Sequence, residues 1–321
     1  MCVHAARNQK HRMGSGMSEE ERTDRIRDNL EKDVKKFRNC PDVTVNRAVV
    51  MFCSSSSSEL LQQHLSDRKQ RNFPAADWMK RLAEKLANLS PDPKLAGLGA
   101  LAIGVFIDII SASSSSSETL KEALRCVFAE EKASEVWDHI DECLKRCVMH
   151  INNTEELVGD IRRIEVQLSA AITRLKNSMV RDGHMTSEAL KAWVNGAAFH
   201  IQVLIHLVRL GGNQSCDPVE RLISAYLSDL DPLFKKHKEA VEKKCRKGYT
   251  FNESPWSAWP YFETEEGESR STIPSVRFER YFEAYYEEHY SRQKDEIRRH
   301  FMTVRDELPR LVSLVGHLSV Q

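Results

Sequence analysis

The residue types best suited to metal chemistry fall on one short stretch, at His139, Cys143, Cys147 and His150. Spacings of three and four residues place them near one face of a helix, and thiolate and imidazole groups are common zinc ligands. Along a helix, however, the four residues extend over roughly 16 Å, whereas zinc needs every donor within about 2.0–2.3 Å. We therefore interpret the cysteines as buried residues of a helix seam and expect no metal site.

Two further candidates, His200 and His206, lie on a predicted helix that is apolar on most sides, from Trp193 to Leu210. A separation of six residues points the two rings to different sides of a helix, so they cannot bind one ion together. We interpret both as hydrogen-bonded core histidines. The alternative is acid-triggered loosening of the core, because imidazole titrates near neutral pH.

Signatures of the common enzyme classes are missing from the sequence. The chain has no glycine-rich phosphate loop ending in Lys-Ser or Lys-Thr, no Gly-x-Ser-x-Gly elbow and no His-Glu-x-x-His motif. It also has no pair of Cys-x-x-Cys motifs. We therefore expect a non-enzymatic protein with no catalytic residues and no cofactor.

Composition narrows the possible partners and the fold class. Among 321 residues, lysine plus arginine balance aspartate plus glutamate at 47 each. A nucleic-acid-binding protein normally carries a basic excess, so we expect no nucleic-acid partner, and no pattern implies a small-molecule substrate. The chain contains only 13 Gly and 10 Pro, which together with its many charges favours helices over a strand-rich fold.

One apolar run, Leu95–Ile110, stands out because its only charged residue is Asp108. Small residues recur at four-residue spacing, at Ala96, Ala100 and Gly104, and such a stripe permits close helix packing. As a helix the run spans roughly 24 Å, short of a hydrocarbon core of about 30 Å. A permanent core helix is the preferred interpretation, ahead of a conditionally membrane-inserting hairpin and a constitutive anchor.

The remaining segments predict helices joined by flexible or irregular connections. Residues 1–17 have no apolar signal-peptide core and are expected to form a disordered basic tail, consistent with a cytoplasmic protein. Two poly-serine tracts, 54–58 and 113–117, are expected to act as hinges. Apolar residues alternating by three and four predict a helical hairpin over 118–181.

The C-terminal part combines an aromatic segment with a heptad pattern. Residues 249–275 are predicted to form a long loop whose Trp256, Trp259, Tyr261 and Phe262 pack against the bundle or contact a membrane or ligand. Residues 276–320 are predicted to form one long helix with a kink at Pro309.

Together these features predict an all-α fold, an elongated bundle of long antiparallel helices with coiled-coil-like seams and a single domain over 18–321. The expected function is a non-enzymatic scaffold or interaction protein that binds a protein partner or a second copy of itself. The alternative is an amphitropic, membrane-associating protein that inserts 95–110. This second layout resembles, in architecture only, α-helical pore-forming proteins that carry a short apolar hairpin on a long-helix bundle.

Overall fold

The computed structural model describes residues 19–52, 57–69, 97–111, 120–127, 133–150, 153–211, 215–251 and 258–313. The chain separates into two compact units: unit 1 comprises Met1–Asn39 and Arg246–Glu288, and unit 2 comprises Cys40–Cys245 and His289–Gln321. This division differs from the single domain expected from the sequence. The predicted basic tail, the second serine tract, Ala96 and Trp256 lie outside the described residues.

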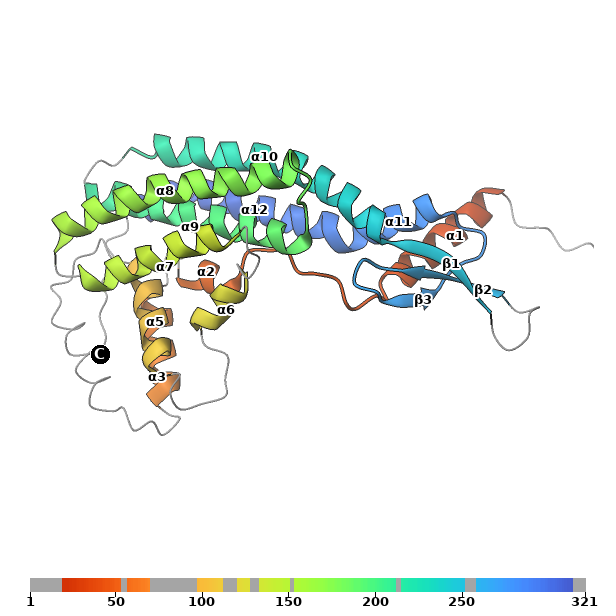
Figure 1. Ribbon diagram of the computed structural model, residues 1–321, viewed down its shortest axis with the longest axis horizontal. Coiled ribbons are helices and arrows are strands. Elements are labelled where there is room, and N and C mark those ends of the chain that lie inside the picture. Colours follow the sequence, from red (N-terminus) through yellow and green to blue (C-terminus); the bar gives the residue numbers. More distant parts are fainter. Residues whose placement is uncertain are drawn as a thin grey trace, which may run out of the picture. The chain divides into compact units, whose positions relative to one another are not determined.

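Unit 1 combines two helices with a small antiparallel sheet (Figure 1). Its elements are α1 (Glu19–Val34), β1 (Arg246–Phe251), β2 (Ala258–Glu263), β3 (Ser269–Ser271) and α11 (Phe278–Tyr286). The strand order is β1-β2-β3, with Gly248 opposite Tyr261 and Phe262 opposite Arg270. Phe262 is fully buried, and its ring lies 5.8 Å from that of Phe37 and 4.8 Å from that of Tyr281.

The sheet corrects the prediction that residues 249–275 form a loop. Aromatic and β-branched side chains favour strands here, although Pro260 within β2 cannot donate a ladder hydrogen bond. The strand tolerates it because the Pro260 carbonyl still accepts a hydrogen bond from the Thr272 amide at 2.8 Å. Tyr261 covers Gly248, where any Cβ would lie only 2.8 Å from the tyrosine ring.

Unit 2 is entirely helical in its described residues, apart from short connections. Its helices are α2 (Arg47–Phe52), α3 (Ser57–Lys69), α5 (Leu98–Ser111), α6 (Leu120–Val127), α7 (Ser134–Met149), α8 (Thr154–Val180), α9 (Ser187–Gly211), α10 (Asp217–Lys244), α12 (Arg292–Asp306) and α13 (Leu308–Ser313). The two units together confirm the all-α class, because the described chain is mostly helical and its only sheet is small. The coiled-coil seams stay a prediction.

Helix α9 is the centre of unit 2, as its all-round apolar sequence predicted. It packs against α8, α10 and α13, and Figure 1 shows it among the long helices. Trp193 and Phe199 are almost completely buried. Gly196 permits the close approach of neighbouring helices, since a Cβ there would lie 2.9 Å from Val136 of α7.

The predicted hairpin over 118–181 contains three described helices, α6, α7 and α8, and residues 128–132 between α6 and α7 lie outside the described part. The described chain has α6 and α7 where one helix was predicted, and α8 begins after Asn153, whose side chain accepts a hydrogen bond from the Glu156 amide. Ion pairs link α7 to α8, including Arg174 with Glu135 and Arg146 with Asp160. The two helices therefore pack together as a pair.

The single long helix predicted over 276–320 is also corrected. After α11 the chain forms a π-helical turn at Glu287–Ser291, continues as α12 and breaks at Glu307 before α13. The break precedes the predicted kink at Pro309, which sits in the first turn of α13, where a missing amide donor costs least. Residues 314–321 lie outside the described part.

A second proline behaves differently, because Pro232 lies inside the continuous helix α10. Proline at this position therefore does not end the helix, which runs on to Lys244.

Candidate functional site: an apolar pocket beside the buried helix

The predicted apolar segment forms α5, which begins at Leu98 and is covered by neighbouring helices. Its side chains from Leu98 to Val105 are at most 3% exposed where the residue is hydrophobic, and the helix packs against α2, α3, α6, α7 and α9. Gly104 faces Phe52 and Leu120, since a Cβ there would lie 3.3 Å and 3.4 Å from them. Ala100 is fully buried, and the side chain of Asp108 lies outside the described residues.

The first turn of α5 is held by a histidine of α9. Gly97 has a φ of 88°, a conformation that glycine adopts without strain. The Leu98 amide then donates a hydrogen bond of 2.6 Å to His206 Nε2. His206 therefore satisfies one of the helix amides that lack an intrahelical acceptor, and this contact requires an unprotonated Nε2.

The other predicted core histidine, His200, joins three helices. Its Nδ1 lies 2.6 Å from the Tyr226 hydroxyl on α10, and its Nε2 lies 2.8 Å from Glu165 Oε1 on α8. Burial raises the pKa of Tyr226, so the phenol stays protonated. The two histidines do not face one ligand, in agreement with their spacing.

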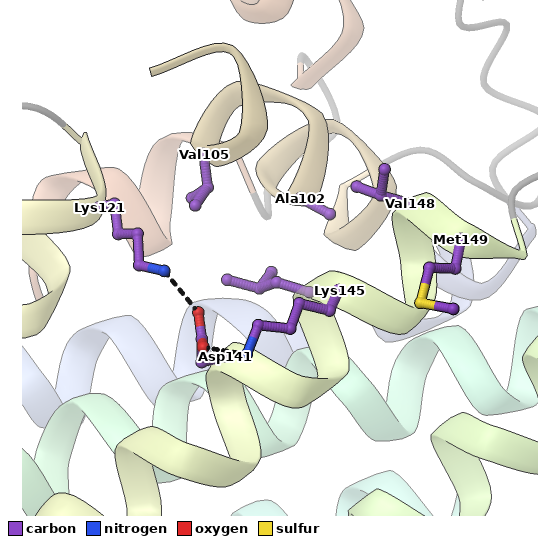
Figure 2. Close-up of a pocket in the computed structure, with 8 residues that line it drawn as sticks. Ala102, Val105, Lys121, Asp141, Lys145, Val148 and Met149 are labelled. Carbon is purple, nitrogen blue, oxygen red and sulfur yellow. Dashed lines mark ion pairs between the residues drawn. The ribbon is translucent and has the colours of Figure 1, made fainter. Parts of the chain in front are cut away.

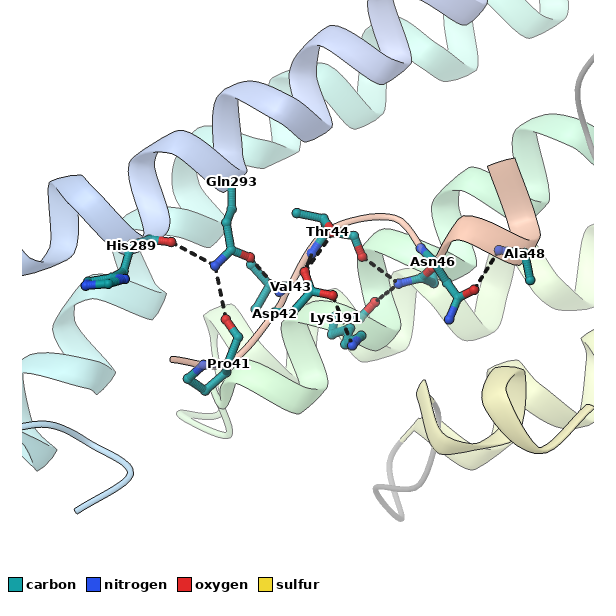
Figure 3. A network of polar contacts seen from close by, with 10 residues as sticks. Pro41, Asp42, Val43, Thr44, Asn46, Ala48, Lys191, His289 and Gln293 are labelled. Atoms are coloured by element: carbon teal, nitrogen blue, oxygen red, sulfur yellow. Dashed lines mark hydrogen bonds and ion pairs between the residues drawn. The ribbon is translucent and has the colours of Figure 1, made fainter. Parts of the chain in front are cut away.

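Two side-chain amides fix the segment that leads into α2 (Figure 3). Asn195 of α9 accepts a hydrogen bond from the Asn46 amide at 2.6 Å and donates to the Thr44 carbonyl at 3.2 Å. Gln293 of α12 accepts from the Val43 amide at 2.7 Å and donates to the Pro41 carbonyl at 3.1 Å. These contacts satisfy backbone groups of an irregular segment, which is a structural role.

The pocket that distinguishes this part of the molecule lies between α5, α6 and α7 (Figure 2). It is partly open, has a volume of about 180 Å³ and has an almost wholly apolar wall. The residues that line it are Ala102, Val105, Lys121, Asp141, Leu144, Lys145, Val148 and Met149. Since protein interiors contain few voids larger than a water molecule, a retained apolar pocket beside the core is a candidate binding site.

Three charged side chains form the polar part of the pocket. Asp141 binds Lys121 at 3.0 Å and Lys145 at 2.7 Å. Burial alone would raise the pKa of Asp141, but hydrogen bonds from both lysines outweigh it and lower that pKa. The hydrogen bond to Asp141 raises the pKa of Lys145. Asp141 and Lys145 are therefore ionised at neutral pH.

The residues first considered as metal ligands do not converge. Cys143 and Cys147 are buried in the core beside α7, and His150 Nδ1 lies 2.6 Å from Glu156 near the start of α8. Within the described ranges, no group of three or more His, Cys, Asp or Glu side chains is arranged to hold a metal ion.

The three described aromatic residues among the four singled out in the sequence have different environments. Phe262 belongs to the core of unit 1, Tyr261 covers Gly248, and Trp259 is 56% exposed on β2. Trp256 lies outside the described residues. The structure thus does not bring these residues together as one site.

A serine–histidine pair was not predicted from the sequence. Ser187 Oγ, at the start of α9, lies 2.9 Å from His237 Nε2 on α10, and the Tyr290 ring lies 4.7 Å from the imidazole. Both members are buried, and burial lowers the pKa of His237 to about 4. An imidazole with that pKa is a weak general base at neutral pH, and the buried pair has no described access for a substrate.

No family model, curated protein or solved structure matches this chain. Among the described residues, no helix is both long enough and apolar enough to cross a membrane.

Proposed function

We propose that this chain is a non-enzymatic helical interaction protein that binds an apolar group of a protein partner in the pocket between α5, α6 and α7. The observation that carries the proposal is the apolar pocket of about 180 Å³ beside the core helices, which no described side chain fills. Apolar pockets of this kind receive anchor side chains at protein interfaces, where a few buried contacts supply most of the affinity.

The buried Ser187–His237 pair does not favour catalysis, because its geometry leaves no described approach for a substrate and its histidine is a weak base. We propose a cytoplasmic location, which is supported by the thiols of Cys147 and Cys216, neither of which forms a disulfide in the described part of the chain.

Filling the pocket tests this function. A library of single-helix peptides is selected for binding to the full chain. The affinity of the selected helices is then measured for the unmodified protein and for the Ala102→Leu variant, in which the added side-chain atoms are expected to occupy the pocket. The matched control is Val166→Ala, a 62% exposed position on α8. We expect Ala102→Leu to weaken binding at least about tenfold and the control to leave it unchanged. Selected helices that bind the Ala102→Leu variant as tightly as the unmodified protein would contradict the proposal.

A second candidate function, reversible membrane association through α5, is favoured by the hydrogen bond from Leu98 to His206. A protonated imidazole carries hydrogen on both nitrogens and cannot accept this bond, and its charge opposes the positive end of the helix dipole. Two other charged or titratable side chains lie near the start of α5. Arg209 lies beside Gly97, and His64 of α3 has its ring 5.8 Å from that of Phe52, whose carbonyl also lies beside Gly97. Acid would therefore loosen the start of α5.

Liposome flotation at neutral and mildly acidic pH distinguishes the two functions. For membrane association we expect flotation of the full chain in acid only, and its loss in His206→Gln, which can keep an acceptor but does not titrate. Flotation of both proteins, or of neither, would contradict acid-controlled release of α5 through His206.

A further inference from the structure

The size of the pocket between α5, α6 and α7 favours one apolar side chain over a drug-sized ligand. Its volume is about 180 Å³. An engineered apolar cavity of about 150 Å³ holds benzene, whereas sites for drug-sized ligands measure about 300–1,000 Å³. The pocket therefore matches an anchor of the size of leucine or phenylalanine.

The arrangement of its walls favours an anchor presented by a helix. Ala102 and Val105 are three residues apart on α5, and Leu144 and Val148 are four apart on α7, so each wall is made by successive turns of one helix. Two such walls form a groove of the kind that receives an amphipathic helix. Met149, 67% exposed, lies at the pocket with a flexible thioether that can adapt to the occupant.

The charges at the pocket favour an acidic partner. Lys121 and Lys145 share the single carboxylate of Asp141, so the lining residues carry a net positive charge. The Lys145 side chain is 58% exposed and is therefore accessible to a further acceptor. Asp138 and Glu142, two further acidic residues of α7 that do not line the pocket, also interact with Lys145, and Glu142 is itself paired with Arg146 at 2.7 Å.

Together these observations lead us to infer a specific partner class, an amphipathic helix that inserts one large apolar side chain into the pocket and places an acidic residue one turn away against Lys121 and Lys145. This inference rests on the proposed function, because it names the chemistry of the partner that the same pocket binds. A partner with basic residues at those positions would be repelled.

A selection experiment tests the inference. A library of helices carries a fixed leucine or phenylalanine anchor, with the positions three and four residues to either side randomised, and is selected on the full chain. We expect enrichment of Asp and Glu at the randomised positions. Binding of the selected helices should fall about tenfold in Lys145→Glu and stay unchanged in Lys235→Glu, the same charge reversal at an exposed position on α10.

The outcomes separate the inference from the proposed function. Selected helices that show no enrichment of Asp or Glu, but whose binding is lost in the Ala102→Leu variant, overturn the inference and leave the proposed function in place. Selected helices whose affinity does not change in the Ala102→Leu variant, or a selection that yields no binding helix, contradict both the inference and the proposed function. Decanoate is tested as a competing probe, and tight decanoate binding without any helix binding would identify a small amphiphile as the occupant instead.

Discussion

Side-chain packing differs between two regions of unit 2, the centre around α9 and the corner formed by α5, α6 and α7. At the centre, the His200 ring uses both nitrogens, toward Tyr226 at 2.6 Å and Glu165 at 2.8 Å, and the side chains around it fill the space between α8, α9 and α10. At the corner, the core helix α5 borders an apolar pocket of about 180 Å³ that no described side chain fills.

This difference separates stability from binding. A close-packed centre stabilises the native state, so changes there should alter the free energy of unfolding. An unfilled pocket contributes little to packing, so changes there should alter partner affinity and leave the fold almost unchanged. The predictions below test this separation, beginning with the largest effect on stability.

The largest effect is expected at Trp193, which is fully buried and lies edge-on to Tyr226 with 5.5 Å between ring centroids. Trp193→Ala should lower the free energy of unfolding by about 4 kcal/mol, because it removes a large side chain from a site that cannot collapse. Urea denaturation measures the loss. Val166→Ala serves as the control and should change stability by less than about 0.5 kcal/mol. A loss below about 1 kcal/mol for Trp193→Ala would show that the centre is loosely packed.

The next effect is a loss of stability in acid through His237. Burial, with a smaller contribution from Lys244, lowers its pKa from 6.5 to about 4 in the folded protein. The unfolded chain therefore binds more protons between these values, so the stabilising contribution is complete above pH 6.5 and is lost as the pH falls toward 4. The full loss is about 3 kcal/mol.

Denaturant titrations across that pH range measure this contribution. His237→Phe should show a shallower dependence of stability on pH than the unmodified protein. His300, whose pKa burial also lowers to about 4, adds a contribution of the same sign in both proteins. Equal slopes for the two proteins would contradict a neutral, buried His237.

A smaller effect is expected at the hydroxyl that meets His200. Tyr226→Phe leaves the ring in place but removes the partner of His200 Nδ1, and should cost about 1–2 kcal/mol. A double-mutant cycle with His200→Phe isolates this contact, because the hydroxyl should matter much less once the imidazole is gone. Equal costs of Tyr226→Phe in both backgrounds would mean that the hydrogen bond contributes nothing to stability.

The smallest effect on stability is expected at the corner. Ala102→Leu fills existing space, so the free energy of unfolding should change by less than about 1 kcal/mol in either direction. Thermal unfolding of this variant is compared with that of the unmodified protein. A strongly destabilised variant would show that the pocket lacks room for an anchor and would weaken the comparison between the two regions.

The sequence predicted the parts of the fold that depend on local periodicity. The apolar positions of α8, such as Leu157, Ile161, Ile164 and Leu168, are all buried, and α9 is central as its composition indicated. Helical periodicity reports which face of one helix is buried. It does not report how separate helices meet.

The missed features depend on contacts between distant residues. The sheet pairs β1 with β2 at 246–263 around a proline, and the strands are too short for a clear alternating pattern. The pocket joins Ala102 of α5 to Lys121 of α6 and Asp141 of α7, which are far apart in sequence. The pairing of Ser187 with His237 is equally non-local. No spacing rule within one element identifies such sites.

The most direct test of the central claim is photo-crosslinking from the anchor of a selected helix. The anchor is replaced by a benzophenone side chain, the complex is irradiated, and the linked residues are identified by mass spectrometry. Binding in the pocket predicts crosslinks concentrated on α5 and α7, at Ala102, Val105, Leu144, Val148 or Met149. Crosslinks concentrated on other described helices, with none on α5 or α7, would contradict the assignment of this pocket as the binding site.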